Sequence, residues 1–295
     1  TGELSAQDLQ TKEKELWRTI RKIKSLGTLP VVVQRTLTML GDPNVTLSAV
    51  GRELQTDPTI AAQILRMVNS AFYSLAEKIN TIDRAVVALG ANSVRQTILM
   101  AVVFEKFKGI DSKEAQSLWY HSVLAGQLAR AIAADRHLGP LAEEAFSAGL
   151  LHCIGKFALL QYFPEAIRAI KDLVQKDVPT DDAEREVLGT THAEVGAYLT
   201  RFWQFPDPMV EATSYHKTRL NVIRNRTDLG PVTLIVHAAC RLAHLPADES
   251  LEKAVDALDE PFMTFHKVSK GFILNSLPRF AKESRTIVTE LFKTK

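Results

Sequence analysis

Histidine and cysteine side chains are the residues of this sequence with the clearest capacity for chemistry. Seven of them stand at suggestive places from residue 121 onward: His121, His152, Cys153, His192, His216, His237 and Cys240. Imidazole and thiolate are good ligands for zinc and iron, and four of them converging can hold a metal ion tetrahedrally. The spacings are too long for a zinc finger or ribbon, and a lone histidine on an apolar helix is more often hydrogen-bonded in the core. A metal site is therefore one interpretation among several.

Residues 149–156 concentrate this chemistry. They place His152-Cys153 inside an apolar run that ends in Gly155 and Lys156. Burying polar groups costs free energy unless they are paired or bound to something. A helix made only for packing has little reason to carry them, so this octapeptide is either a site or the remnant of one.

Helix signals surround these residues on both sides. Asp57-Pro58 predicts an N-cap followed by a first-turn proline, and Gly90 predicts a helix end. Thr191 and Glu194 form a capping-box pattern that places His192 on the first turn of a helix. Residues 143–161 are predicted as one helix carrying the octapeptide. No stretch alternates with period two, so we expect an all-α fold.

Composition sets limits on the class of protein. The 295 residues are 46% apolar and 24% charged, with a net charge of +2. That charge is too mild to indicate nucleic-acid binding, and no apolar run approaches the roughly 20 residues of a membrane span. Two distant cysteines make no disulfide framework. We expect a cytoplasmic protein.

The chain divides into three parts. Residues 1–26 predict a basic amphipathic helix, which could bind a membrane or a partner, or simply pack on the body of the protein. The polar stretch 109–112 is the best internal boundary. The expected parts are an N-terminal helix (1–26), a helical subdomain (27–110), and a second helical subdomain with C-terminal helices (111–295).

Two family resemblances go further. The order of His121, His152, His192, His216 and a late polar position resembles the HD superfamily of metal-dependent phosphohydrolases. Leu29-Pro30, Asp57-Pro58 and residues 64–73 (Ile-Leu-Arg-Met-Val-Asn-Ser-Ala-Phe-Tyr) resemble the HDOD domain, the HD-related output domain of bacterial signalling proteins. The two matches cover roughly residues 25–245. They imply an N-terminal helical subdomain followed by an HD-like helical bundle.

The departures from the enzyme pattern concern its metal ligands. In the resemblance the ligand positions fall on His121, His152, Cys153 and Cys240, so a cysteine stands at both carboxylate positions. Catalytic members rely on hard oxygen ligands to activate water. The cyclic-di-GMP phosphodiesterase signature Gly-Tyr-Pro is absent, and Lys217 follows His216 where a second histidine would stand. A lysine there would repel a second metal ion. We therefore expect hydrolase activity to be lost.

Three interpretations of the histidine and cysteine set stay open. The site is vestigial and the cysteines fill space; or His121, His152, Cys153 and Cys240 bind one zinc or iron ion; or the two cysteines form a redox-sensitive disulfide. His237, which shares a helix face with Cys240 and His244, could replace one ligand.

Several polar residues are candidates for binding an anion or a nucleotide-like ligand. They are Lys156, His192, His216, Lys217 and Arg219, of which the last two open a basic loop. Charged groups of this kind can hold phosphate through charge-assisted hydrogen bonds. A solvated loop is the plainer alternative.

The leading functional hypothesis is a non-catalytic module of bacterial signal transduction that acts through protein partners or a bound ligand. The alternative is a divergent metal-dependent phosphohydrolase or cyclic-dinucleotide phosphodiesterase. Nucleic-acid binding by the helices around residues 57–73 is not expected, because they carry no basic stripe.

Overall fold

The computed structural model describes residues 6–22, 29–69, 73, 77–107, 109–110 and 113–292. Every regular element in these ranges is a helix, as expected from the sequence. The α-helices are α1 Ala6–Lys22, α2 Val31–Met39, α3 Leu47–Leu54, α4 Pro58–Val68, α5 Ile82–Phe107, α6 Lys113–Asp135, α7 Ala142–Leu151, α8 Ile154–Tyr162, α9 Pro164–Val174, α10 Thr180–Leu188, α11 His192–Phe202, α12 Asp207–Tyr215, α13 Leu220–Ile223, α14 Pro231–Leu242, α15 Leu251–Asp256, α16 Glu260–His266 and α17 Lys270–Phe292. A 3₁₀ turn, η2, spans Gly139–Leu141. Parts of the motif 64–73 and of the boundary 109–112 lie outside the described residues.

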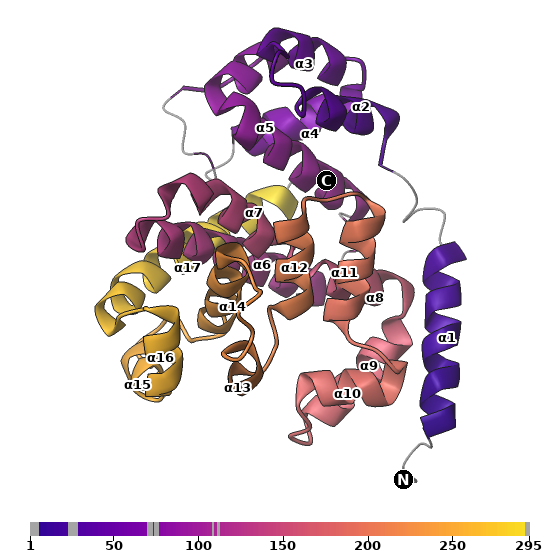
Figure 1. Cartoon of the computed structure of the whole chain (residues 1–295), viewed down its shortest axis with the longest axis vertical. Helices are drawn as coiled ribbons and strands as arrows, with labels where there is room; N and C mark the ends of the chain where they lie inside the picture. Colours follow the sequence, from indigo (N-terminus) through magenta and orange to yellow (C-terminus); the bar gives the residue numbers. More distant parts are fainter. Residues whose placement is uncertain are drawn as a thin grey trace.

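Helices α2–α5 pack on one another at one end of the molecule (Figure 1). Side-chain caps begin two of these helices: Thr46 accepts from the amide of Ala49, and the predicted cap Asp57 accepts from the amides of Thr59 and Ile60. Such caps satisfy amide donors that have no partner within the helix. The apolar face of α4 is buried against α5.

Helix α5 joins this end to the rest of the molecule. It bends by 117° at Gly90, whose φ of 73° is a left-handed conformation that glycine adopts without strain. The helix end predicted at Gly90 is confirmed, since Gly90 is not helical and the second half of α5 runs in a new direction. The segment after the bend packs against α7 and α8. No single helix in the described ranges is long and apolar enough to cross a membrane; the two halves of α5 meet that test only as a bent pair.

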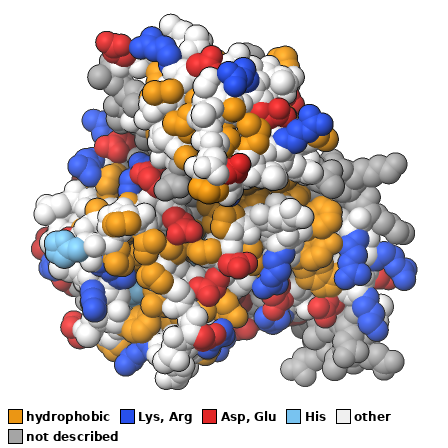
Figure 2. Space-filling model, turned by 45° about the horizontal axis from the view of Figure 1, so that its top comes forward, with side chains coloured by type: hydrophobic (Ala, Val, Ile, Leu, Met, Phe, Trp, Pro, Cys, Tyr) orange, Lys and Arg blue, Asp and Glu red, His pale blue; other side chains and the backbone are white. Residues whose placement is uncertain are grey.

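The second group of helices forms the bundle that holds the site. Helix α6 lies against α7, α14 and α17, while α11 packs between α8 and α12 (Figure 1). The buried side chains form one continuous core through both groups. On the face drawn in Figure 2, acidic and basic side chains are interspersed among apolar ones, without a basic stripe.

The prediction of one helix over residues 143–161 is wrong. Helix α7 ends at Leu151 and α8 begins at Ile154, because Cys153 leaves the helical conformation (φ −94°, ψ 18°). The break redirects the chain so that Gly155 meets the start of α11. A Cβ atom at Gly155 would lie 1.9 Å from the carbonyl oxygen of His192. Residues 145–155 are buried without interruption, so hydrophobic periodicity carries no sign of the break.

Helix α1 packs against α10 on the flank of the bundle (Figure 1). Its apolar stripe buries Leu16 and Ile20, and Trp17 lies 5.1 Å from Tyr198 between ring centroids. The described part of the predicted basic helix therefore takes the packed alternative. Residues 1–5 and 23–26 of that prediction lie outside the described residues.

Candidate metal centre

Six of the predicted residues meet in the interior of the bundle. His121 comes from α6, His192 opens α11, His216 caps the end of α12, and Cys240 lies on α14; His152 and Cys153 occupy the break between α7 and α8. Apart from His121, which is partly exposed, these side chains are buried. All four predicted metal ligands are thus part of one cluster.

The donor atoms of the cluster face one another. The Nε2 atoms of His121 and His152 are 3.1 Å apart, and those of His192 and His216 are 3.0 Å apart. The Sγ atom of Cys153 lies 3.9 Å from Nε2 of His216, and that of Cys240 lies 3.8 Å from Nε2 of His121. Three such donors lie within 4.8 Å of one another in several combinations, such as His152, His216 and Cys240. Both cysteines are free thiols.

Hydrogen bonds at Nδ1 fix which nitrogen of each ring carries the proton. Nδ1 of His152 donates to the carbonyl of Gly149 (2.5 Å), and Nδ1 of His216 donates to that of Thr213 (2.8 Å). Nδ1 of His192 lies 2.6 Å from the carboxylate of Glu184, which also accepts the backbone amide of His192. A neutral imidazole has one proton, so each of these rings directs the lone pair of Nε2 into the cluster.

This arrangement suits a cation. In the pair His192 and His216, two lone pairs face each other at 3.0 Å, and neither nitrogen has a proton to donate. Two acceptors cannot form a hydrogen bond, and both rings are buried away from water. A metal ion accepts such lone pairs, and histidine ligands of metals characteristically bind a carboxylate or carbonyl through the other nitrogen. The residues present therefore fit a metal ion.

Burial sets the protonation of the cluster. It lowers the pKa of His121, His192 and His216 well below the ordinary histidine value, with the neighbouring histidines and lysines adding to the effect. The rings are consequently neutral at neutral pH, which is the form that binds metals. Burial likewise raises the pKa of the Cys153 thiol, which the positive charges of Lys156 and Lys217 oppose.

Two residues outside the predicted set join the site. Glu184, on α10, orients His192, and no sequence pattern marks it because its contact spans two helices. The ring of His244 stacks on that of His121 with centroids 4.3 Å apart. Its distance of four residues from Cys240 on a helical stretch was the available signal, since such residues lie on one helix face. The Nζ atom of Lys217 donates to Nε2 of His244 at 3.1 Å.

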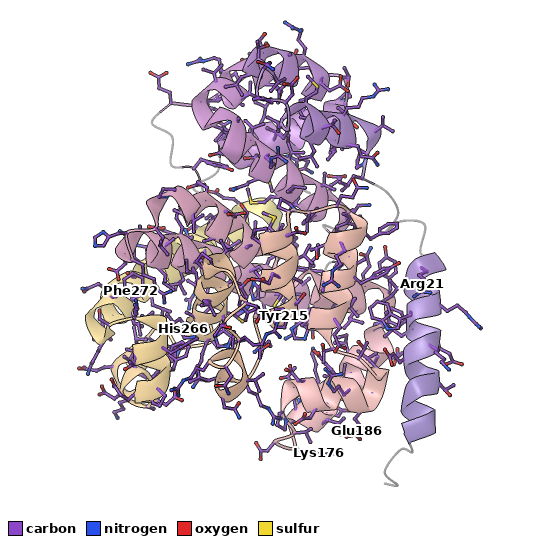
Figure 3. The ribbon with its side chains drawn as sticks, viewed as in Figure 1. Arg21, Lys176, Glu186, Tyr215, His266 and Phe272 are labelled. Carbon is purple, nitrogen blue, oxygen red and sulfur yellow. The ribbon has the colours of Figure 1, made fainter. Side chains whose placement is uncertain are left out.

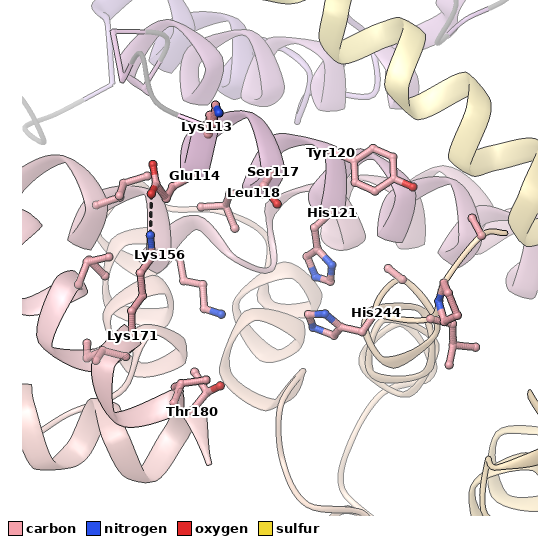
Figure 4. A pocket seen from close by; sticks show the side chains of 18 of the residues that line it. Lys113, Glu114, Ser117, Leu118, Tyr120, His121, Lys156, Lys171, Thr180 and His244 are labelled. Atoms are coloured by element: carbon pink, nitrogen blue, oxygen red, sulfur yellow. Dashed lines mark hydrogen bonds and ion pairs between the residues drawn. The ribbon is translucent and has the colours of Figure 1, made fainter. Parts of the chain in front are cut away.

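A pocket of about 820 Å³ opens over one side of the cluster. Polar side chains in its lining include His121, His244, Lys156 and Glu184, and Leu118, Ile170 and Val174 contribute apolar wall. In Figure 4, His121 and His244 face the same open space. Lys171 and Glu114 form an ion pair of 2.7 Å at the rim. The volume is within the range of small-molecule sites.

Two predicted side chains lie elsewhere. His237 does not replace a metal ligand: its Nδ1 is 2.9 Å from Nε2 of His266, and its Nε2 donates to the carbonyl of Thr218. His266 lies on α16 (Figure 3). On the same face of α14, His237 therefore contacts α16, whereas Cys240 contacts His121 of α6. Arg219 is exposed and pairs with Asp182 at 3.3 Å rather than facing the cluster.

Comparison with models of protein families identifies the family of this chain. The model of the HDOD domain matches residues 26–219, which is most of the chain. This protein belongs to the HDOD family. The resemblance in the N-terminal half and the HD-like order of histidines are thereby explained by one domain.

Solved structures share the fold of this HDOD protein. A Shewanella amazonensis protein, whose name calls it a candidate phosphohydrolase, is 24% identical with a TM-score of 0.72, and the match covers 98% of this chain and 100% of that one. An HDOD domain protein of unknown function from Geobacter sulfurreducens also has 24% identity and a TM-score of 0.72, over 98% and 99% of the chains. A curated Treponema pallidum relative, named as an uncharacterized protein, is 23% identical over 211 residues. That match covers 71% of this chain and 41% of the relative's length.

Proposed function

We propose that this HDOD protein is a non-catalytic module of bacterial signal transduction, acting in the cytoplasm through signalling proteins. The observation that carries the proposal is the chemistry of the cluster. Thiols stand at both positions, Cys153 and Cys240, where the HD enzyme pattern has carboxylates, and the ammonium of Lys217 lies against His244 at the edge of the cluster. Without bridging oxygen ligands the cluster lacks the groups that hold an open binuclear centre and activate water.

A single zinc or iron ion in the cluster completes the proposal. His121, His152, Cys153 and Cys240 would hold it, with His192 and His216 as further donors from the same interior. Soft thiolate and imidazole ligands select zinc or iron over magnesium or calcium. When bound, such an ion would supply a structural cross-link between α6, the break between α7 and α8, and α14, and its thiolates would give it a redox-sensitive character.

The pocket provides a place for a nucleotide-like ligand. Its lining combines the ammonium of Lys156 with the rings of His121 and His244, and its walls are partly apolar. Lys156 is half-buried, and its positive charge acts on Glu184, His192 and Cys153. An anionic group would offset this charge. We assign partner binding to the separate subdomain of residues 27–110, because the pocket draws its lining from the second subdomain, residues 111–295.

The same pocket favours one alternative, a divergent metal-dependent phosphohydrolase or phosphodiesterase. A pocket that opens onto a cluster of metal donors is the arrangement such an enzyme needs. The difference from the leading proposal is turnover, so the two are separable in one set of assays.

The test combines metal content with hydrolysis. Protein purified from metal-replete cells is expected to contain close to one equivalent of zinc or iron, which falls in Cys153→Ser and His152→Ala. Cyclic dinucleotides and a generic phosphodiester are expected to remain intact with added Mn²⁺, Fe²⁺ or Ni²⁺. Metal-free wild-type protein would contradict the metal centre and leave the vestigial interpretation. Turnover that disappears in His152→Ala would replace the signalling module with the hydrolase.

A further inference from the structure

His244 brings a third donor to the side of the cluster that faces the pocket. It lies two residues beyond the end of α14 and four residues after Cys240. Its donor atom and those of His121 and Cys240 lie within 4.8 Å of one another. His244 is exposed, whereas Cys240 is buried, so this trio connects the interior to the pocket. Histidine nitrogen and cysteine sulfur are both zinc ligands, and a zinc site with three protein ligands keeps its fourth position open.

Lys217 forms a hydrogen bond with the ring of His244 in this structure. Its Nζ atom donates to Nε2 of His244 at 3.1 Å. An ammonium has no lone pair, so Nε2 supplies the lone pair and the ring proton lies on Nδ1. Neither nitrogen of His244 is then able to bind a cation.

Metal binding and the hydrogen bond exclude each other whichever nitrogen the metal takes. A metal ion at Nε2 uses the lone pair that accepts from Lys217. A metal ion at Nδ1 forces the single ring proton onto Nε2, which then no longer accepts. The exclusion follows from the one lone pair of a neutral imidazole and holds for any position of the ring.

We propose that His121, Cys240 and His244 form a pocket-facing metal position, and that Lys217 competes with the metal ion for the lone pair of His244. The position rests on the proposed metal centre for His121 and Cys240, and it adds His244 and Lys217. Its open side faces the pocket, where an anionic ligand completes the coordination. Because Lys217 directly follows His216, the metal ion also determines whether the segment after α12 is tied to α14.

The test measures the affinity for Co²⁺, a spectroscopic substitute for zinc, by competition with a chromophoric chelator. Lys217→Met is expected to bind Co²⁺ at least about tenfold more tightly, since a hydrogen bond from a charged donor contributes that much. Lys156→Met is the matched control, because it removes an equal charge near the cluster without touching His244. The gain of Lys217→Met beyond that control is expected to vanish in the His244→Ala background.

The outcomes separate this inference from the proposed metal centre. Equal effects of the two lysine variants, or a Lys217→Met gain that persists with His244→Ala, would overturn the competition. Wild-type protein that binds Co²⁺ through a thiolate with no change in His244→Ala would overturn the pocket-facing position alone. Failure of every form to bind Co²⁺ would overturn both. Exposed His137→Ala serves as the control for loss of a histidine elsewhere.

Discussion

At the scale of single residues, the proposed metal centre depends on the group that accepts the Nδ1 proton of each histidine. Three imidazoles direct their Nε2 atoms inward because Gly149, Thr213 and Glu184 each hold an Nδ1. Only Glu184 does so with a charge. Burial raises the pKa of this carboxyl group, whereas the nearby Lys156 and Lys217 and the amide of His192 act in the opposite direction. The orientation of His192 therefore has the strongest dependence on a single side chain.

Replacement of this carboxylate tests its orienting role. Glu184→Gln keeps the size of the side chain and removes the charge that stabilises the Nδ1 proton of His192. Metal affinity is expected to fall by roughly 10- to 100-fold, as for other residues that support a metal-bound histidine. Glu186→Gln, on the exposed face of the same helix, is expected to leave it unchanged. Equal affinities of the two variants would show that His192 does not hold the metal.

The second histidine pair gives a pH prediction at the same scale. Burial lowers the pKa of His266 to about 3 from an ordinary value of 6.5, with further contributions from His237, Arg136 and Arg241. The unfolded chain thus binds a proton between these two values that the folded chain does not. The stability that comes from burying His266 in its neutral form is present above pH 6.5, and it is lost as the pH falls from 6.5 to about 3.

His266→Gln keeps an N–H donor for His237 but does not titrate. Between pH 7 and pH 4 it is expected to lose roughly 3 kcal/mol less stability than the wild type. Urea unfolding at the two pH values measures this difference. His137→Gln, at an exposed site, is the control. Identical pH dependence in His266→Gln and wild type would mean that His266 is protonated in the folded protein.

At the scale of elements, the contact of α8 with α11 places Cys153 and His192 in one cluster. The two helices approach so closely that only glycine fits at their crossing. At Gly155 a Cβ atom would meet the carbonyl of His192, and at Gly196 it would lie 3.1 Å from the backbone nitrogen of Gly155. The backbone of His192 is part of this contact, so the position of a metal ligand and the packing of two helices are fixed together.

Gly155→Ala tests that contact. The added methyl group overlaps backbone atoms that cannot rotate away, so a loss of about 3 kcal/mol in the free energy of unfolding is expected. Gly271→Ala is the matched control on α17, where a Cβ atom meets nothing within 4 Å. That variant is expected to be neutral or up to about 1 kcal/mol more stable. Equal stability of the two variants would contradict the close crossing.

At the scale of the whole molecule, α1 is a peripheral helix that packs against α10, a helix that contributes to the candidate metal centre. Its buried Leu16 and Ile20 lie on the side that packs against α10, and α10 carries Glu184. The line of contact therefore runs from the N-terminal helix to the residue that orients His192. Attachment of α1 depends on a few apolar side chains, which makes it the element most easily released without unfolding the bundle.

A charge placed in the contact between α1 and the body of the protein is expected to detach α1. Ile20→Asp places an unpaired carboxylate in the contact with the body, at a cost of several kcal/mol. Trypsin is expected to cleave after Arg18 and Arg21 at least about tenfold faster, since 1.4 kcal/mol already corresponds to a factor of ten. Thr11→Asp adds the same charge at an exposed position on the opposite side of α1 and is expected to be cleaved as the wild type is. Equal cleavage of both variants would show that α1 is free already.

The sequence by itself determined the helical class, the family resemblance and the residues of the cluster. Helix caps are local, so Asp57 and Thr191 predicted helix starts correctly. The histidines and cysteines stood out because their chemistry is rare in a core. The break at Cys153 was missed because apolar residues continue across it.

Only the tertiary structure decided which donors face one another. The partners of His192 and His237 come from α10 and α16, and distances across helices leave no periodic trace in the sequence. For the same reason, the sequence named Lys217 as a candidate, but its contact with His244 became evident only when α14 and the end of α12 were placed side by side. The residue types identify the metal donors, and the packing of the helices determines which donor atoms face one another.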